Sequence, residues 1–221
     1  MANTVRITEI VHETHDVLNI YVEKPAGFEF TPGQATEVSI NKPGWEDAGR
    51  PFTFVCLPSD DYLEFMIKSY PDHDGVTKEL ASLQEGDELI LADVFGAIHY
   101  RGEGSFIAGG AGVTPFISII RELASRDALG DNKLIFANRS RDDIILQDEF
   151  RTLLGERFIN ILEQQAEGHA NGRITAEFLE DCGIDVNGYI YLCGPRPMMN
   201  AVKEQLYNLG VDGRNIVQEK F

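Results

Sequence analysis

Apolar and polar positions alternate along the first hundred residues of the chain, as they do in strands with one buried face. In the run LNIYVE, Leu18, Ile20 and Val22 fall on one face, and the run YLEFMIK at 62–68 repeats the pattern. Turn sequences rich in Pro and Gly, such as KPAG, TPGQ and NKPG, separate these runs. One short helix is predicted to start near Thr77. The pattern therefore predicts an antiparallel sheet or barrel.

The pattern changes after the sequence YRGEG, which ends at Gly104. Short apolar runs then alternate with stretches of helical periodicity, and the runs are SFIAGG, KLIFAN, RFINIL, GYIYLCG and NIVQEKF. Such alternation predicts a parallel sheet with both faces covered. The chain is therefore expected to contain a β-barrel domain over residues 1–101 and an α/β domain over residues 102–221.

Composition adds the expectation of an ordinary globular protein, since 43% of the 221 residues are hydrophobic. The apolar runs are too short to span a bilayer, and the sequence MANTVRITEI has no basic stretch leading into an apolar one. We therefore expect a cytoplasmic protein without membrane insertion.

No metal site and no disulfide framework are expected. Cys56, Cys182 and Cys193 are widely spaced and form no CxxC pair, whereas zinc and iron–sulfur sites need clustered thiolates. The sequence HETH at 12–15 resembles the zincin motif, but it is one residue short and lies in a predicted strand.

The formal net charge of −17 bears on the choice of partners. Nucleic acid and anionic membranes would be repelled by such a chain. A solubilising surface is the favoured explanation of the charge, ahead of an acidic docking patch. Nothing in the sequence indicates an oligomeric state.

The sequence AGGAGVTPF at 108–116 places three glycines directly after a predicted strand. Thr114 is predicted as the N-cap of the next helix and Pro115 as its first residue, so that helix amides face a ligand. A P-loop would have a lysine after the glycines, and a Rossmann fingerprint would have a third glycine in place of Pro115. The loop alone indicates either a phosphate-bearing ligand or a tight strand–helix turn.

Three further stretches carry candidate chemistry. In YLCGPRPMM at 191–199, a strand runs into Gly194 and then into a helix; RPFTF at 50–54 places an arginine at the start of a strand. In DGVTKEL, Gly75 and Thr77 lie at the start of the predicted short helix, a possible phosphate position. Taken separately, each stretch is better explained by core packing or an ordinary strand than by ligand binding.

Taken in order with the terminal EKF, these stretches resemble the motifs of the ferredoxin–NADP reductase family, in its compact form without an iron–sulfur domain. RPFTF is similar to R-x-Y-S/T, DGVTKEL to G-x-x-S/T, GGAGVTPF to G-G-x-G-x-T-P, CGPRPMM to C-G-P-x-x-M, and EKF to an E-x-aromatic ending. The resemblance covers nearly the whole chain. It implies a flavin-binding Greek-key β-barrel over 1–101 and a Rossmann-like nicotinamide-dinucleotide domain over 102–221.

The resemblance implies roles in flavin binding for both barrel motifs. Arg50 would pair with a flavin phosphate, and the hydroxyl of Thr53 would lie near flavin N5. The segment Gly75, Val76 and Thr77 would hold a pyrophosphate by backbone amides and a hydroxyl. The remaining residues of this expected flavin site are Pro51, Phe52, Ile67, Lys68 and Ser69.

In the second domain, the resemblance implies that Gly110, Gly112, Thr114 and Pro115 contact the nicotinamide dinucleotide. Cys193 and Gly194 would border the nicotinamide, with Pro195, Met198 and Arg139 also in the coenzyme site. Thr53, Cys193, Glu219 and Phe221 form the implied catalytic set, in which Phe221 would stack on the flavin ring.

One departure from the family pattern concerns the first motif, where Phe52 stands in place of the usual tyrosine. A hydrogen bond to the flavin chain or phosphate is then missing, which weakens the choice between FAD and FMN. FAD is favoured over FMN because the segment at 75–77 suits a pyrophosphate.

The coenzyme is expected to be NADH or NADPH, with NADH favoured. Glu163 follows the third predicted strand of the second domain, and its carboxylate would repel the 2′-phosphate of NADPH. Arg139, Ser140, Arg141 and Arg173 are available nearby and could instead hold that phosphate.

The implied activity is hydride transfer between NAD(P)H and bound FAD, with electrons passed on to a protein such as ferredoxin or flavodoxin. Reduction of free flavin, a quinone or another small acceptor is the alternative enzyme, and an electron-transfer subunit of a larger complex is a second. A regulatory nucleotide-binding module is a third, against which the presence of Arg50, Thr53, Cys193 and Phe221 argues.

Overall fold

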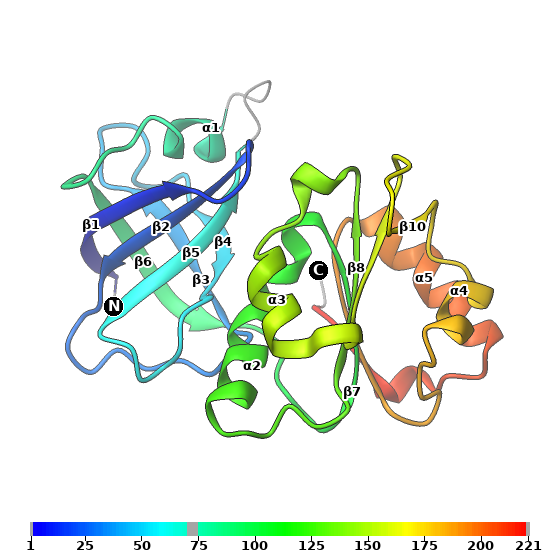
Figure 1. Ribbon diagram of the computed structural model, residues 1–221. Coiled ribbons are helices and arrows are strands. Elements are labelled where there is room, and N and C mark those ends of the chain that lie inside the picture. The colour runs from blue at the N-terminus through cyan, green and yellow to red at the C-terminus, as the bar shows by residue number, and fades with distance from the viewer. Residues whose placement is uncertain (1, 70–74, 220–221) are drawn as a thin grey trace. The chain divides into compact units, whose positions relative to one another are not determined.

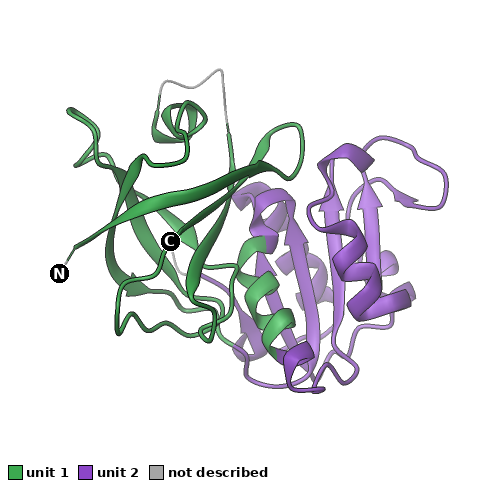
Figure 2. Ribbon diagram, turned by 60° about the vertical axis from the view of Figure 1, so that its left-hand side comes forward, with its two compact units in different colours: residues 1–99, 114–122 green, residues 100–113, 123–221 purple. Residues whose placement is uncertain are grey.

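The computed structural model describes residues 2–69 and 75–219 (Figure 1). The chain divides into two compact units, one of residues 1–99 with 114–122, and one of residues 100–113 with 123–221 (Figure 2). Within the described ranges, no helix has the length and apolar character needed to cross a membrane.

The first unit is built on a six-stranded antiparallel sheet, with strand order β4-β3-β6-β1-β2-β5. An isolated antiparallel bridge between Phe54 and Phe65 joins the two outer strands and closes the sheet into a barrel. The antiparallel barrel predicted from the alternating pattern is confirmed. Its strands are β1 (Asn3–His12), β2 (Val17–Glu23), β3 (Ala35–Ile40), β4 (Arg50–Thr53), β5 (Tyr62–Lys68) and β6 (Glu88–Phe95).

The alternating positions fill the barrel interior. Leu63, Phe65 and Ile67 of β5 belong to one buried cluster with apolar residues of the neighbouring strands. The Phe54 ring contacts the rings of Phe30 and Phe65 at centroid distances of 4.4 and 5.2 Å. The short helix α1 (Val76–Leu80) adds its two buried end residues to the same cluster.

Most of helix α2 (Thr114–Ser125) belongs to the first unit, although it follows the glycine loop in sequence. The amide of Gly33 donates to the hydroxyl of Ser118 at 3.1 Å. Gly33 has φ +96°, and a Cβ there would lie 2.5 Å from the carbonyl oxygen of Ile98. Only glycine fits this turn, which attaches the barrel loop to the helix.

The second unit is a six-stranded parallel sheet with strand order β10-β9-β8-β7-β11-β12. Helices α4 (Ala176–Asp181) and α5 (Arg196–Asn208) pack on one face of this sheet, and α3 (Gln147–Leu154) lies on the other (Figure 1). This confirms the predicted α/β domain. The strands are β7 (Gly104–Gly109), β8 (Lys133–Asn138), β9 (Phe158–Leu162), β10 (Ala170–Asn171), β11 (Tyr189–Cys193) and β12 (Ile216–Val217).

Two local expectations differ from the structure. Thr114 is the first residue of α2 and not its N-cap, because the 3-10 turn η1 (Gly110–Val113) runs directly into the helix and leaves Val113 as the cap. The run NIVQEKF forms a strand of two residues, Ile216–Val217, among those described. Because the N-cap of α2 is Val113, the prediction of the cap at Thr114 is wrong.

Tyr191 fixes the segment that leads into the parallel sheet. Its hydroxyl accepts the amides of Arg101 and Gly102 at 2.8 and 3.1 Å and donates to the Gly102 carbonyl at 2.7 Å. Its ring is fully buried and stacks on Phe106, with centroids 4.3 Å apart. One side chain thus satisfies three backbone groups of the linker.

Replacing this hydroxyl should destabilise the second unit. We expect Tyr191→Phe to lower the free energy of unfolding by about 1–3 kcal/mol, because two amides and a carbonyl lose their partner while the ring packing stays. Urea unfolding followed by circular dichroism measures this loss. Tyr207→Phe, at a tyrosine that is 55% exposed, serves as the control and should change little; an equal loss in both variants would contradict the role of Tyr191.

Candidate functional site

Strand β4 carries the first predicted motif at the edge of the barrel sheet. Arg50 and Pro51 are exposed, and Phe52 and Thr53 are partly buried. Nη1 of Arg50 donates to the carbonyl of Gly49 at 2.8 Å, and no carboxylate in the described ranges forms an ion pair with it. Most of the guanidinium donors therefore remain available to an anionic group such as a flavin phosphate. Phe52 packs against the barrel core.

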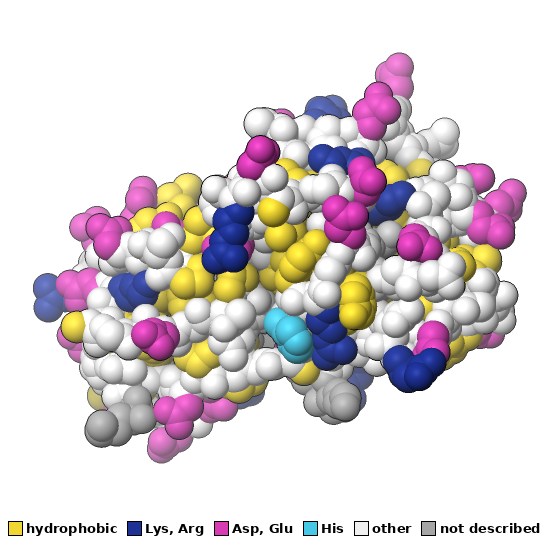
Figure 3. All heavy atoms as spheres, turned by 90° about the horizontal axis from the view of Figure 1, so that it is seen from below, with side chains coloured by type: hydrophobic (Ala, Val, Ile, Leu, Met, Phe, Trp, Pro, Cys, Tyr) yellow, Lys and Arg dark blue, Asp and Glu magenta, His cyan; other side chains and the backbone are white. Residues whose placement is uncertain are grey.

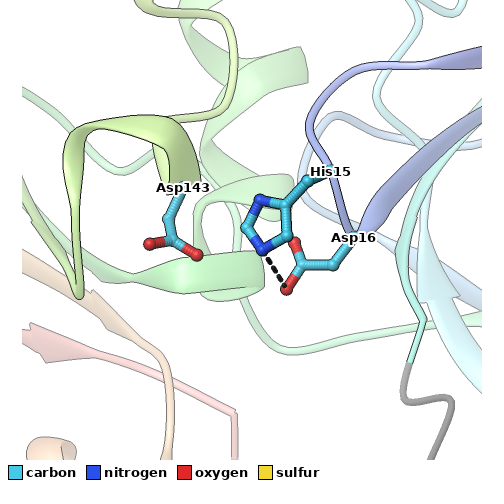
Figure 4. A group of neighbouring side chains, drawn as sticks. All are labelled: His15, Asp16 and Asp143. Carbon is cyan, nitrogen blue, oxygen red and sulfur yellow. Dashed lines mark ion pairs between the residues drawn. The ribbon is translucent and has the colours of Figure 1, made fainter.

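The end of β5 is held by the turn between β1 and β2. Nζ of Lys68 lies 2.7 Å from a carboxylate oxygen of Asp16, and the Ser69 amide donates to the Asp16 carbonyl at 2.7 Å. His15 Nε2 lies 3.6 Å from the same carboxylate (Figure 4). Ile67, next to Lys68, is buried. The charge of Lys68 is thus shared with Asp16, which sequence reasoning did not foresee.

The segment at 75–77 forms the start of α1. The Gly75 carbonyl accepts the amides of Lys78 and Glu79, and Gly75 itself is extended. The side chain of Val76 is buried in the barrel core, so this residue has its backbone amide alone to offer a ligand. Thr77 is partly buried.

The glycine loop and the end of β11 are neighbours in the second unit. Ala108 of β7 pairs with Cys193 of β11, and the strand order reverses between these two strands. Open α/β sheets bind ligands at this kind of reversal, beyond the carboxyl ends of the strands. The stretches at 108–116 and 191–199, both of which stand out in the sequence, therefore lie on neighbouring strand ends.

The two loops approach each other so closely that side chains are excluded. A Cβ on Gly112 would lie 2.6 Å from the Cys193 carbonyl oxygen and from the Gly194 amide nitrogen. Gly110 has φ +51° and Gly194 has φ +155°, which other residues rarely adopt. Met198 packs on this contact, since a Cβ on Gly194 would meet its Cε at 2.9 Å. The loops are only partly buried, and their lack of side chains fits a dinucleotide that needs close approach.

Cys193 keeps its proton at neutral pH. Burial raises the pKa of its thiol from 9.0 to about 12, and the negative charge of Glu219 adds to the effect. The structure therefore brings Glu219 close enough to Cys193 for electrostatic interaction. A neutral thiol can border a ligand without acting as a nucleophile. Phe221, the last predicted site residue, lies outside the described residues.

We expect the protein to lose folding stability at alkaline pH because its thiols are buried. Burial also raises the pKa of Cys56 to about 12 and of Cys182 to about 11. Between about pH 9 and 11 the unfolded chain releases thiol protons that the folded chain retains, so folding stability falls as the pH rises.

For fully buried Cys56, this fall should be about 1.4 kcal/mol per pH unit. Unfolding midpoints in urea at pH 7 to 11 measure it, and Cys56→Ala should flatten the slope by that amount. An identical slope in the variant would contradict this assignment.

The loops after β8 and β9 are joined by their backbones. The Glu163 amide donates to the Asn138 carbonyl at 3.0 Å, and the Gln164 amide to the Arg139 carbonyl at 2.8 Å. The side chains of Arg139 and Glu163 are both exposed. Arg139 and Glu163, which the sequence analysis considered for the choice between NADH and NADPH, therefore lie on adjacent loops.

Two features of these loops were missed by sequence reasoning. The Ser140 amide and hydroxyl both donate to the Asp143 carboxylate, at 2.9 and 2.6 Å, in a capping box. The pattern S-x-x-D could have revealed this. Asn138 is 94% buried, and neither polar atom of its side chain has a hydrogen-bond partner among the described residues. The signal for this position was a polar residue at the end of the apolar run KLIFAN.

Two successive stretches of the chain are similar to known protein domains. Residues 2–92 match the model of an FAD-binding domain, and residues 106–204 match that of an oxidoreductase NAD-binding domain. The crystal structure of a ferredoxin NADP+ reductase from Neisseria gonorrhoeae, with bound FAD and NADP, superposes with a TM-score of 0.85 at 18% identity, covering 99% of this chain and 98% of that one. At that identity, the superposition supports the fold.

Curated relatives match over most of the chain. The reductase component of propane 2-monooxygenase from Rhodococcus jostii (strain RHA1) is 30% identical over 98% of this chain and 62% of its own length. NADH-cytochrome b5 reductase 1 from Coccidioides immitis (strain RS) is 30% identical over 92% of this chain and 69% of its own length. The chain spans about three fifths of the length of the propane 2-monooxygenase reductase components that it matches. With an FAD-binding domain followed by an NAD-binding domain, the chain belongs to the ferredoxin–NADP reductase family of flavoprotein reductases.

Proposed function

We propose that this protein is an NAD(P)H-dependent flavoprotein reductase that takes hydride from a nicotinamide onto bound FAD and passes the electrons to an acceptor. The observation that carries the proposal is the pair of glycine-lined strand ends at the sheet reversal, Gly110–Gly112 and Cys193–Gly194, in a chain whose first domain matches FAD-binding domains. We assign flavin binding to residues 1–101 and coenzyme binding to residues 102–221.

In the flavin domain, Arg50 would hold a phosphate through its available donors, and the amides and hydroxyl at 75–77 would hold the rest of a pyrophosphate, which favours FAD over FMN. Bound FAD supplies the chemistry, since it accepts a hydride and can release electrons one at a time. Thr53 would orient the reactive edge of the ring through its hydroxyl. Pro51, Phe52, Ile67, Lys68 and Ser69 would line the remaining site.

In the coenzyme domain, Gly110 has open space around it and would let the dinucleotide approach closely, while Gly112 lets its loop pack against Cys193 and Gly194. Thr114 and Pro115 would follow at the helix start. Cys193 would border the nicotinamide as a neutral thiol, because its pKa of about 12 keeps it protonated. Glu219 and Phe221 complete the proposed catalytic set. Gly194, Pro195, Met198 and Arg139 complete the proposed coenzyme site.

We propose NADH as the preferred coenzyme. The exposed carboxylate of Glu163 follows β9, where it would accept a ribose hydroxyl and repel a 2′-phosphate. The hydroxyl of Ser140, which could have served a phosphate, already donates to Asp143. Arg141 and Arg151 argue instead for NADPH, because their positive charges could hold its 2′-phosphate. Burial is the main cause that lowers the pKa of His169, and the charges of both arginines lower it further, so both lie near this residue.

The acceptor is proposed to be a redox protein such as ferredoxin or flavodoxin. Two matched relatives are named for a monooxygenase and for cytochrome b5, which supports a protein acceptor. Residues 1–99 contain 18 acidic and 6 basic side chains, so an acidic acceptor would associate slowly unless its contact surface is neutral or basic. Acidic side chains are dispersed over the face in Figure 3, with Lys and Arg among them. Free flavin or another small oxidant is the alternative acceptor.

An anaerobic titration tests this function. The purified chain should show the visible spectrum of bound flavin, and stoichiometric NADH should bleach it faster than NADPH does. Faster bleaching by NADPH would overturn the coenzyme choice and point to Arg141 and Arg151. A colourless chain that takes up no FAD would overturn the reductase proposal in favour of a nucleotide-binding module. Steady NADH oxidation with artificial acceptors would argue against a subunit that is inactive outside a larger complex.

A further inference from the structure

The barrel closes at a weak seam between β4 and β5. Strand β3 pairs with β4 through four residue pairs, and β2 with β5 through seven, whereas β4 and β5 meet at the single isolated bridge between Phe54 and Phe65. The Val55 amide adds one hydrogen bond to the Glu64 carbonyl, at 3.0 Å. Two such contacts hold strands weakly, so we looked for a further interaction between the chain after β4 and β5.

An arginine of α2 bridges the seam from outside the barrel. Nη1 of Arg121 donates to the Val55 carbonyl at 2.9 Å and to Oε2 of Glu64 at 2.8 Å. All three residues belong to the first compact unit. The guanidinium therefore joins the chain directly after β4 to the middle of β5.

The partner carboxylate is held where water hardly reaches it. Glu64 is 1% exposed, and its Oε1 accepts Nδ2 of Asn19 at 2.8 Å. Burial raises the pKa of neighbouring Tyr21 to about 12, with the Glu64 charge as the next cause. A buried carboxylate needs such partners, because removing one of them leaves an uncompensated charge away from water.

The residues proposed to bind flavin lie on both sides of this seam. Thr53 ends β4 two residues before Val55, and Ile67 follows Glu64 by three residues on β5. Any change in the spacing of the seam would alter the distance between the Arg50–Thr53 and Ile67–Ser69 segments. On the basis of the proposed flavin site, we propose that Arg121 is a positioning residue that sets this spacing through its bonds to Val55 and Glu64.

The test separates positioning from folding. Arg121→Met leaves Glu64 buried without its cation and should lower both the melting temperature of the apoprotein and its affinity for FAD. The double variant Arg121→Met with Glu64→Met removes both charges, so its melting temperature should return to within a few degrees of the wild type. Its dissociation constant for FAD should stay about tenfold higher or more, and the visible circular dichroism of bound FAD should remain altered.

Arg121→Lys keeps a cation opposite Glu64 but replaces the planar fork by a point charge, so it should show the same split between normal melting and weaker FAD binding. Arg126→Met, at an exposed arginine directly after the same helix, is the matched control and should bind FAD as the wild type does. FAD affinity within threefold of the wild type and an unchanged dichroism spectrum in the double variant and in Arg121→Lys would overturn the inference while leaving the reductase proposal intact. A wild-type chain that binds no FAD would overturn both.

Discussion

Gly112→Ala should lower the affinity for NADH by about 100-fold or more while FAD stays bound. The added Cβ would lie 2.6 Å from the Cys193 carbonyl and from the Gly194 backbone, far inside van der Waals contact. The neighbouring atoms are backbone, so the two loops have to separate and no side chain can turn aside. A shift of about 1 Å at a substrate-positioning loop is enough to cost ~100-fold in rate.

Stopped-flow reduction of the flavin over a range of NADH concentrations measures this effect, and the visible spectrum before mixing reports FAD content. Gly210→Asn is the matched control in the same unit, because Gly210 has φ +86° with open space around it and asparagine tolerates that conformation. NADH affinity within threefold of the wild type in Gly112→Ala would contradict the placement of the coenzyme beside this loop.

The regular parts of the fold could be predicted because their signals are local. Alternating apolar positions in YLEFMIK identified the face of β5 that fills the barrel, and the change of periodicity after Gly104 identified the parallel sheet. Glu64 lies on the opposite face of β5, and nothing local to the strand indicates that this face is covered. Helix α2, more than fifty residues later in the chain, covers that side with Arg121 and leaves Glu64 1% exposed. No local pattern contains that contact.

The candidate site likewise has features that the sequence reveals and features that depend on tertiary contacts. The glycines at 110, 112 and 194 stand out in the sequence, and their need for glycine follows from positive φ or from close backbone approach. The ion pair of Lys68 with Asp16 depends on the turn between β1 and β2 reaching the end of β5, which is a tertiary contact. The N-cap of α2 was misplaced at Thr114 because a preceding 3-10 turn cannot be told from a loop in a glycine-rich sequence.

Arg50→Ala should raise the dissociation constant for FAD by about 100-fold without changing the stability of the apoprotein. A charge-assisted hydrogen bond to a phosphate contributes about 1.5–3 kcal/mol, and the loss of a bidentate pair therefore exceeds a factor of ten in affinity. Among the described residues, the side chain of Arg50 makes one hydrogen bond, to the carbonyl of its neighbour Gly49, and forms no ion pair. Its removal therefore leaves no buried group unsatisfied.

Titration of apoprotein with FAD, followed by quenching of flavin fluorescence, gives the dissociation constant, and thermal melting of the apoprotein gives the stability. Arg50→Lys should recover part of the affinity, since a lysine keeps the charge but not the two parallel donors. Arg6→Ala, at an exposed arginine of β1, is the control for the general loss of one positive charge from an acidic chain. Because salt screens long-range attraction more than a direct contact, the difference between Arg50→Ala and Arg6→Ala should persist at high ionic strength. If the two variants bind FAD equally well, the phosphate is held elsewhere, and β4 does not carry the flavin site.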